Sequence, residues 1–275
     1  MDIAGVATLL LVGIGSAVFG SIVGLGGGVI IVPTLMLAGQ WLTGETVNAP
    51  TAVGTSLAVL IFTALSSTMT YARLGTVDWK SGWLFFITSG PAAILGARWA
   101  DAVSDGPFQL AFGCFILLMF GLMVARERLK PANIRWPVQR SFRDRTGREY
   151  TYGYNIWSAL LIGAGVGFVS GLFGIGGGSL FVPLMVLLYG FPPHVATATS
   201  MFVILLSSLF GSVTHFLGGN IEPVALLALA PGALLGGRIG ARIAARLSGS
   251  QLMWLLRMTL LAMAGFLIYQ GIRTM

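Results

Sequence analysis

Long apolar runs, separated by short polar or glycine-containing connections, cover most of the chain. We place them at residues 3–23, 27–39, 51–72, 81–100, 107–125, 155–173, 177–189, 195–217, 223–244 and 250–272. Most are close to the ~20 residues that a helix needs to cross a bilayer. The runs 27–39 and 177–189 are shorter, so we interpret them as tilted spans or as halves of broken or re-entrant helices. This pattern predicts an all-α polytopic membrane protein.

The composition excludes two other classes of protein. Of the 275 residues, 56% are hydrophobic and only 9% are charged. So few charges cannot cover a soluble domain of this size, and a chain this apolar does not stay disordered. The first run has no early Lys or Arg and apolar character continues past residue 30, so we expect it to stay in the mature protein rather than act as a cleaved signal peptide.

The basic residues gather in one polar segment. The whole chain has a formal net charge of +7, and residues 126–152 hold eight Lys or Arg against three Asp or Glu. The positive-inside rule places such a segment in the cytoplasm. We therefore divide the chain into a first membrane repeat (1–125), a basic cytoplasmic linker (126–152) and a second membrane repeat (153–275), and we expect no nucleic-acid partner.

Three sequence blocks occur twice in the same order, which indicates a tandem duplication. They are GLGGGVIIVP from residue 24 and GIGGGSLFVP from residue 174, AVGTS from residue 52 and ATATS from residue 196, and PAAILGAR from residue 91 and PGALLGGR from residue 231. Equivalent connections carry opposite charge: 73–80 is basic but 218–222 is acidic, and 101–106 is acidic but 245–250 lies next to arginines. That reversal predicts two inverted repeats of about five membrane segments each.

The duplicated glycine clusters are the first candidate site. Four glycines in an apolar run make a poor helix, and a broken backbone inside a membrane needs protein or a water-filled cavity around it. Each cluster precedes a helix-forming stretch, so its amides and the positive end of the helix dipole would suit a small anion. The alternative is close helix packing through small residues. The candidate residues are Gly26, Gly27, Gly28, Gly176, Gly177 and Gly178.

Two further repeated features contain polar side chains. The hydroxyls of Thr55, Ser56, Thr199 and Ser200 would donate to an anion, or bond to carbonyls of their own helix. Arg98 and Arg238 are the charged residues that repeat in kind. They would attract or gate the anion from two sides, or reach out to the membrane boundary.

Catalytic and metal-binding patterns are missing from the sequence. We find no nucleophile elbow, zinc-binding helix or phosphate loop, so we expect neither an enzyme nor a cofactor or metal. The lone Cys114 reads as a small apolar side chain. Glu222 before Pro223 predicts a helix N-cap, and Asp78 aligns with Glu222 and serves similarly. A proton-coupling role for His215 or Glu222 is the alternative.

The glycine blocks that begin at residues 24 and 174, with the blocks that end at Arg98 and Arg238, resemble the TauE/SafE sulfite exporter family. The resemblance covers both halves but not the linker, which is longer and more basic than the family pattern. It implies a secondary transporter, and probable exporter, of sulfite or small organosulfonates such as sulfoacetate across the bacterial inner membrane. An anion channel, or an importer of another small sulfur-containing anion, is the alternative. The expected partners are this anion and the lipid bilayer, and the sequence is compatible with a homodimer.

Overall fold

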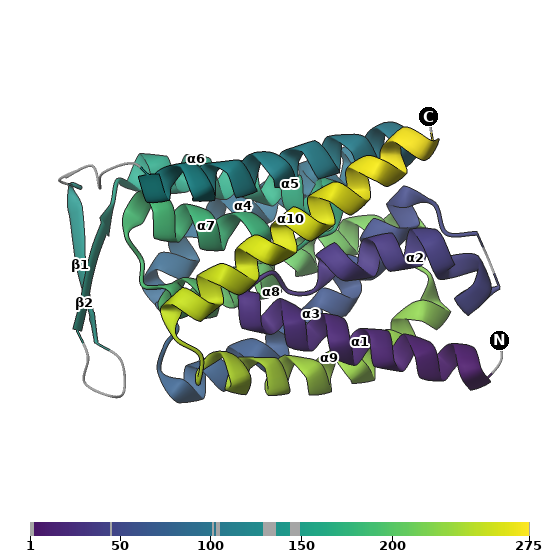
Figure 1. Cartoon of the computed structure of the whole chain (residues 1–275), viewed down its shortest axis with the longest axis horizontal. Helices are drawn as coiled ribbons and strands as arrows, with labels where there is room; N and C mark the ends of the chain where they lie inside the picture. The colour runs from purple at the N-terminus through teal and green to yellow at the C-terminus, as the bar shows by residue number, and fades with distance from the viewer. Residues whose placement is uncertain are drawn as a thin grey trace.

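The computed structural model describes residues 3–44, 46–100, 102, 105–128, 136–143 and 149–274. Helices dominate it (Figure 1). The helices of the first half are α1 (Ile3–Val23), α2 (Gly28–Thr43), α3 (Ala49–Leu74), α4 (Trp79–Ala100) and α5 (Asp105–Arg128). Those of the second half are α6 (Ile156–Phe173), α7 (Gly178–Tyr189), α8 (Pro193–Leu217), α9 (Pro223–Ala244) and α10 (Gly249–Thr274). Each apolar run predicted from the sequence coincides with one of these helices to within a few residues at its ends, so the all-α prediction is confirmed.

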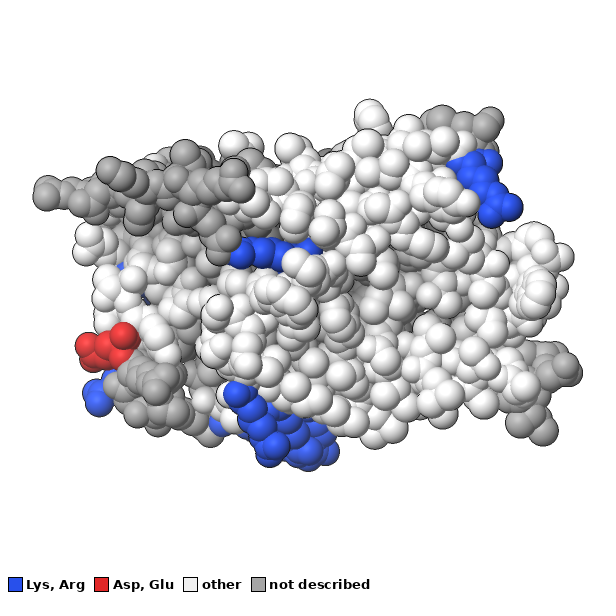
Figure 2. Space-filling model, in the orientation of Figure 1, with Lys and Arg blue, Asp and Glu red and all other residues white. Residues whose placement is uncertain are grey.

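The lengths of the helices fit a membrane. Among the described residues, six helices are long and apolar enough to cross a bilayer by length and composition: α1, α3, α6, α8, α9 and α10. Helices α2 and α7 have 16 and 12 residues, too short to cross upright. Much of the face in Figure 2 carries no charge, and on α10 Trp254 and Tyr269 are more than half exposed. Such apolar surface is suited to lipid.

The two halves of the sequence fold into one another. Helix α1 packs along α9, and α6 packs along α4. Helix α3 packs against both α8 and α9, α4 packs against α8, and α5 packs against α10. The counterpart of each helix of the first half is the helix numbered five higher. If every helix is exchanged for its counterpart, the list of packed pairs stays the same; the α1–α9 pair, for example, becomes the α6–α4 pair. The duplication therefore reappears as a reciprocal set of contacts.

The repeated glycines before Arg98 and Arg238 allow two of these pairings. A Cβ on Gly96 would lie 1.9 Å from the Phe168 carbonyl oxygen, and one on Gly236 would lie 2.4 Å from that of Ile14. Helix α4 thus touches the backbone of α6, and α9 touches that of α1. This close approach is the small-residue packing that membrane helices use.

The linker is not only a loop. Strands β1 (Val138–Arg143) and β2 (Glu149–Tyr154) form an antiparallel hairpin, with Val138 opposite Tyr154 and Arg143 opposite Glu149. The hairpin lies at the end of the molecule opposite to both chain termini (Figure 1). It runs two residues past the linker boundary that the sequence suggested. Within the linker, residues 129–135 and 144–148 lie outside the described residues.

Candidate functional site

Both glycine clusters are helix breaks. Helix α1 ends at Val23 and α2 begins at Gly28, with Gly24, Gly26 and Gly27 between them at φ values of 79°, 79° and 101°. The second cluster has the same form, with φ values of 70–72° at its matching glycines. Only glycine adopts this left-handed region without steric cost. These glycines therefore interrupt the helices inside the bundle, which agrees with the broken helices that the sequence predicted.

Helices α2 and α7 start without side-chain caps. Their N-cap residues, Gly27 and Gly177, form no side-chain hydrogen bond. The first amides of a helix have no partner within that helix, and the helix dipole places partial positive charge there. The Gly26 amide is already engaged, because it donates to the Gly20 carbonyl at 3.1 Å. The amides of residues 30 and 31, and of 180 and 181, donate to the Gly27 and Gly177 carbonyls, so the anion-site hypothesis is limited to the amides of residues 27–29 and 177–179.

The two turns lie directly against each other. A Cβ on Gly28 would lie 2.3 Å from the Gly174 carbonyl oxygen, and one on Gly178 would lie 2.0 Å from that of Gly24. All the glycines of both clusters are buried. The close-packing interpretation thus describes this conformation, and it brings two helix N-termini from different halves to one place.

Each Ser of the repeated Thr-Ser pairs holds the turn of the other half. The Ser56 hydroxyl donates to the Gly174 carbonyl at 2.8 Å, and the Ser200 hydroxyl donates to the Gly24 carbonyl at 3.1 Å. Both serines are fully buried. Their bonds run between the halves, whereas the alternative weighed from the sequence was a bond to a carbonyl of their own helix. Ser200 makes that bond as well, to Thr197 at 2.9 Å.

Each Thr of these pairs fixes a connecting loop of the other half. The Thr55 hydroxyl accepts from the Glu222 backbone N–H at 2.8 Å, and the Thr199 hydroxyl accepts from the Asp78 N–H at 3.0 Å. Glu222 caps α9 through Val224, and Asp78 receives a bond from the Ser81 N–H at the start of α4. Both predicted caps are confirmed. Their attachment to the threonines was not foreseen.

Two apolar residues beside the turns were missed by the sequence analysis. A Cβ on Gly26 would lie 2.6 Å from Leu60, and one on Gly176 would lie 2.8 Å from Ile204. Both side chains approach both turns. They are separated by 144 residues, the same spacing as the Thr-Ser pairs, so extending that alignment by one helical turn would have found them. They fill the space next to the glycines with apolar atoms.

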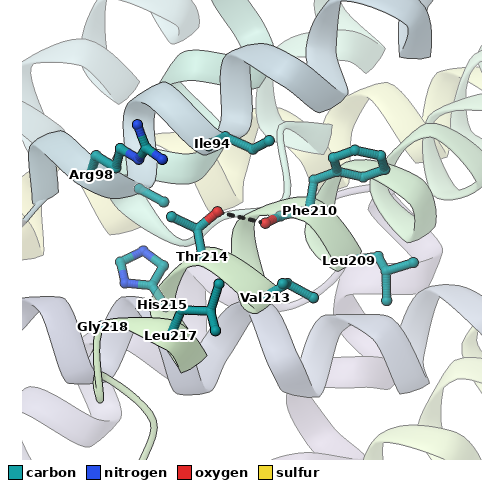
Figure 3. Close-up of a pocket in the computed structure, with 10 residues that line it drawn as sticks. Ile94, Arg98, Leu209, Phe210, Val213, Thr214, His215, Leu217 and Gly218 are labelled. Atoms are coloured by element: carbon teal, nitrogen blue, oxygen red, sulfur yellow. Dashed lines mark hydrogen bonds between the residues drawn. The ribbon is translucent and has the colours of Figure 1, made fainter.

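Arg98 and Arg238 lie away from the turns, in two corresponding pockets. Arg98 and Ile94 of α4 face Thr214 and His215 of α8 across a pocket of about 670 Å³ (Figure 3). Arg238 of α9 lines a smaller one, about 140 Å³, against α3. The five residues of α3 that line the smaller pocket each have a counterpart 144 positions later among the α8 residues that line the larger one, and His215 is an addition there. No glycine of the two turns is among the residues that line these two pockets.

His215 lies at the inner edge of the Arg98 pocket. Its Nε2 atom is 3.3 Å from the Gly171 carbonyl oxygen, and the side chain is buried. Tyr71, its counterpart in the first half, donates to the Ser21 carbonyl at 2.7 Å. Both contacts join the end of a long helix to the helix that leads into a glycine turn. Glu222 lies at the start of α9, where its backbone N–H donates to Thr55 and its carboxylate accepts from the Val224 N–H.

Comparisons with known proteins match this chain to a family of membrane transporters. A family model described as "Sulfite exporter TauE/SafE" matches residues 9–267. The chain is 43% identical over 266 residues to the "Probable membrane transporter protein YunE" of Bacillus subtilis (strain 168), which covers 96% of this chain and 97% of that protein. It is 30% identical over 245 residues to a "Probable membrane transporter protein" of Xylella fastidiosa (strain Temecula1), with 88% and 87% covered. No solved structure gives a significant match.

Proposed function

Because the chain belongs to the TauE/SafE sulfite exporter family, we propose that it is a secondary transporter that carries sulfite or a small organosulfonate such as sulfoacetate out of the cell. The family and the names of the relatives indicate a membrane transporter. The substrate class, the direction and the mechanism are our proposal. The observation that supports it best is the meeting of two uncapped helix N-termini at the crossed glycine turns.

The chemistry of that place suits an oxyanion. A helix N-terminus carries roughly half a positive charge together with outward-pointing amides, and it binds a sulfonate or sulfite group without a charged side chain. Two such ends supply donors for three oxygens. The hydroxyls of Thr55, Ser56, Thr199 and Ser200 lie next to them and complete the proposed site once they leave their present backbone partners.

We take the present conformation as an occluded one. The turns touch, the serines hold them together, and Leu60 and Ile204 fill the adjacent space. In the proposed cycle the two turns separate toward one side of the membrane and then toward the other, around an inverted-repeat axis. The reciprocal helix contacts support that axis. We place the hairpin end on the cytoplasmic side of a bacterial inner membrane. The basic linker forms this end, and basic connections favour the cytoplasmic side.

The remaining charged residues take accessory roles in this proposal. Arg98 and Arg238 attract the anion from opposite sides. His215 and Glu222, near the outer end of α8 and the start of α9, are the candidates for proton coupling. No group of three or more His, Cys, Asp or Glu able to hold a metal occurs in the described part of the chain.

The proposal is tested by counterflow in proteoliposomes. Vesicles loaded with unlabelled sulfite, and separately with sulfoacetate, should accumulate labelled anion transiently from a dilute external solution. With the membrane potential clamped at zero by valinomycin and equal K⁺ on both sides, a channel gives no such accumulation, because labelled and unlabelled ions then move independently through it. Counterflow with chloride or phosphate but with no sulfur oxyanion would refute the substrate class. Efflux assays in inside-out and right-side-out vesicles then determine the direction.

Arg98 gives a more specific prediction. Replacing it by Gln should raise the KM for sulfite several-fold and leave the maximal rate nearly unchanged, since the lost charge acts on approach and not at the glycine turns. Lys at the same position should restore most of the affinity. The matched control is Arg242→Gln, on the exposed surface of α9. Transport kinetics over a range of ionic strength provide the measurement, and an unchanged KM in Arg98→Gln would contradict the role.

A further inference from the structure

The hairpin is tied to the membrane helices through one buried carboxylate. Asp78, in the connection between α3 and α4, is only 2% exposed. Arg140 of β1 donates to its Oδ1 atom at 3.0 Å in an ion pair, and the Tyr152 hydroxyl of β2 donates to Oδ2 at 2.6 Å. Burial, which is the larger cause, and the hydrogen bond to Asp78, which is the second, raise the pKa of Tyr152 far above its usual range. This phenol therefore stays protonated and donates. Both strands thus bind the same carboxylate.

Aromatic contacts place the hairpin over the neighbouring connection as well. The Tyr152 ring lies 3.9 Å from the ring of Phe191, between α7 and α8, and Tyr154 lies 5.9 Å from Tyr189. The Tyr154 hydroxyl also accepts from Ser81 at the start of α4. The hairpin therefore bridges the α3–α4 and α7–α8 connections, which come from different halves of the chain.

The opposite end of the molecule has an acid at the equivalent position but a different environment. Glu222 aligns with Asp78, caps the start of α9, and donates its backbone N–H to a threonine of the other half as Asp78 does. No ion pair to Glu222 occurs within the described residues, where Arg140–Asp78 is the one salt bridge found. The fold of the repeated core does not require the contacts that Arg140 and Tyr152 make to Asp78, because the equivalent Glu222 occupies its position without such contacts among the described residues.

Asp78 also connects the hairpin to the glycine turns. Its backbone N–H donates to Thr199, and the next residue, Ser200, donates to the Gly24 carbonyl. A short chain of polar contacts thus runs from Arg140 and Tyr152 through Asp78 to the turn that precedes α2. Movement of the hairpin away from Asp78 would loosen the loop that Thr199 holds.

We propose that Asp78, Arg140 and Tyr152 form a latch that keeps the hairpin end of the transporter closed and that must release before the substrate path opens at that end. The latch rests on the alternating access proposed above. The three residues are positioning residues: they act on the path through the α3–α4 connection and do not contact the anion. Among the described residues, the equivalent acid Glu222 has no ion-pair partner, so no corresponding latch is found at the other end.

A buried reporter cysteine tests the latch without any substrate. Thr197 lies on α8 against Gly24, is 1% exposed, and its hydroxyl has no hydrogen-bond partner within the described residues, so Thr197→Cys removes no bond. In a Cys114→Ser background, a membrane-impermeant maleimide is added on the hairpin side of oriented vesicles. Arg140→Gln or Tyr152→Phe should raise the labelling rate roughly ten- to hundredfold, the range for losing one charge-assisted hydrogen bond.

The control is Arg143→Gln, which removes an exposed charge from the same strand and should leave the labelling rate unchanged. Arg140→Gln leaves Asp78 without its ion-pair partner and could unfold the loop, so the double variant Asp78→Asn/Arg140→Gln is measured too. It should regain thermal stability while its labelling stays fast, a result that a purely structural clasp does not give. Unchanged labelling in all three latch variants, or equal increases in Arg143→Gln, would overturn the latch. Fast labelling without sulfite counterflow would keep the latch and refute the substrate.

Discussion

Gly28→Ala and Gly178→Ala should each reduce transport severely, although neither glycine has an unusual backbone conformation. The new Cβ atoms would lie 2.3 Å and 2.0 Å from backbone carbonyl oxygens of the opposite turn, where no flexible side chain can move aside. Forcing the turns apart costs about 1–3 kcal/mol, which corresponds to a factor of roughly 5 to 150 in rate. Sulfite counterflow, with thermal stability measured on the same samples, gives both effects.

Matched controls exist in each half of the chain. Gly15 of α1 and Gly165 of α6 precede the two turns, and a Cβ on either meets nothing within 4 Å. Their Ala variants should transport normally and gain a little stability, because Ala favours a helix by about 1 kcal/mol over Gly. If Gly28→Ala and Gly178→Ala transported as well as these controls, the contact of the two turns would have no part in the cycle.

The sequence predicted the helices well because the membrane imposes a strong pattern. Helices α1 and α9 have the bounds of the apolar runs, and the others differ by a few residues at their ends. Apolar side chains are needed along the whole length of such helices, so their limits are visible in the sequence. The helix breaks were also predictable, since four glycines in an apolar run have few other uses.

The partners of the polar side chains were not predictable from one sequence. The duplication identified Ser56 and Ser200 as equivalent, but it could not show that each bonds to the turn of the other half. Such contacts depend on how the halves interleave, and a single chain gives no direct information on pairing across more than a hundred residues. The anion-binding roles of these residues stay predictions.

The hairpin was missed for a different reason. The strand Glu149–Tyr154 places an aromatic residue at every second position, which is the period of a strand, whereas in Val138–Arg143 the position between Val138 and Phe142 is taken by Arg140. The strong positive charge of the linker drew the interpretation toward a solvated loop. The period of the apolar residues there, weighed apart from the charge, favours a short sheet.

Ser56→Ala should impair transport more than Ser200→Ala, although the two serines are equivalent in the duplication. The Ser56 hydroxyl gives its single proton to the Gly174 carbonyl at 2.8 Å. The Ser200 hydroxyl divides its proton between the Gly24 carbonyl at 3.1 Å and the Thr197 carbonyl of its own helix at 2.9 Å. Leaving a buried acceptor unpaired costs about 1–3 kcal/mol, so Ser56→Ala should lose that amount and Ser200→Ala clearly less.

The comparison is made on folded protein in the same counterflow assay, with thermal unfolding as the measure of stability. Ser16→Ala is the control, because Ser16 is equally buried but donates only within its own helix, to the Gly13 carbonyl at 3.3 Å. That variant should keep nearly full activity. A loss in Ser56→Ala no greater than in Ser16→Ala would show that the hydroxyl does not hold the opposite turn. A larger loss in Ser200→Ala would instead place the stronger constraint on the turn before α2, since the hydroxyl of Ser200 contacts that turn.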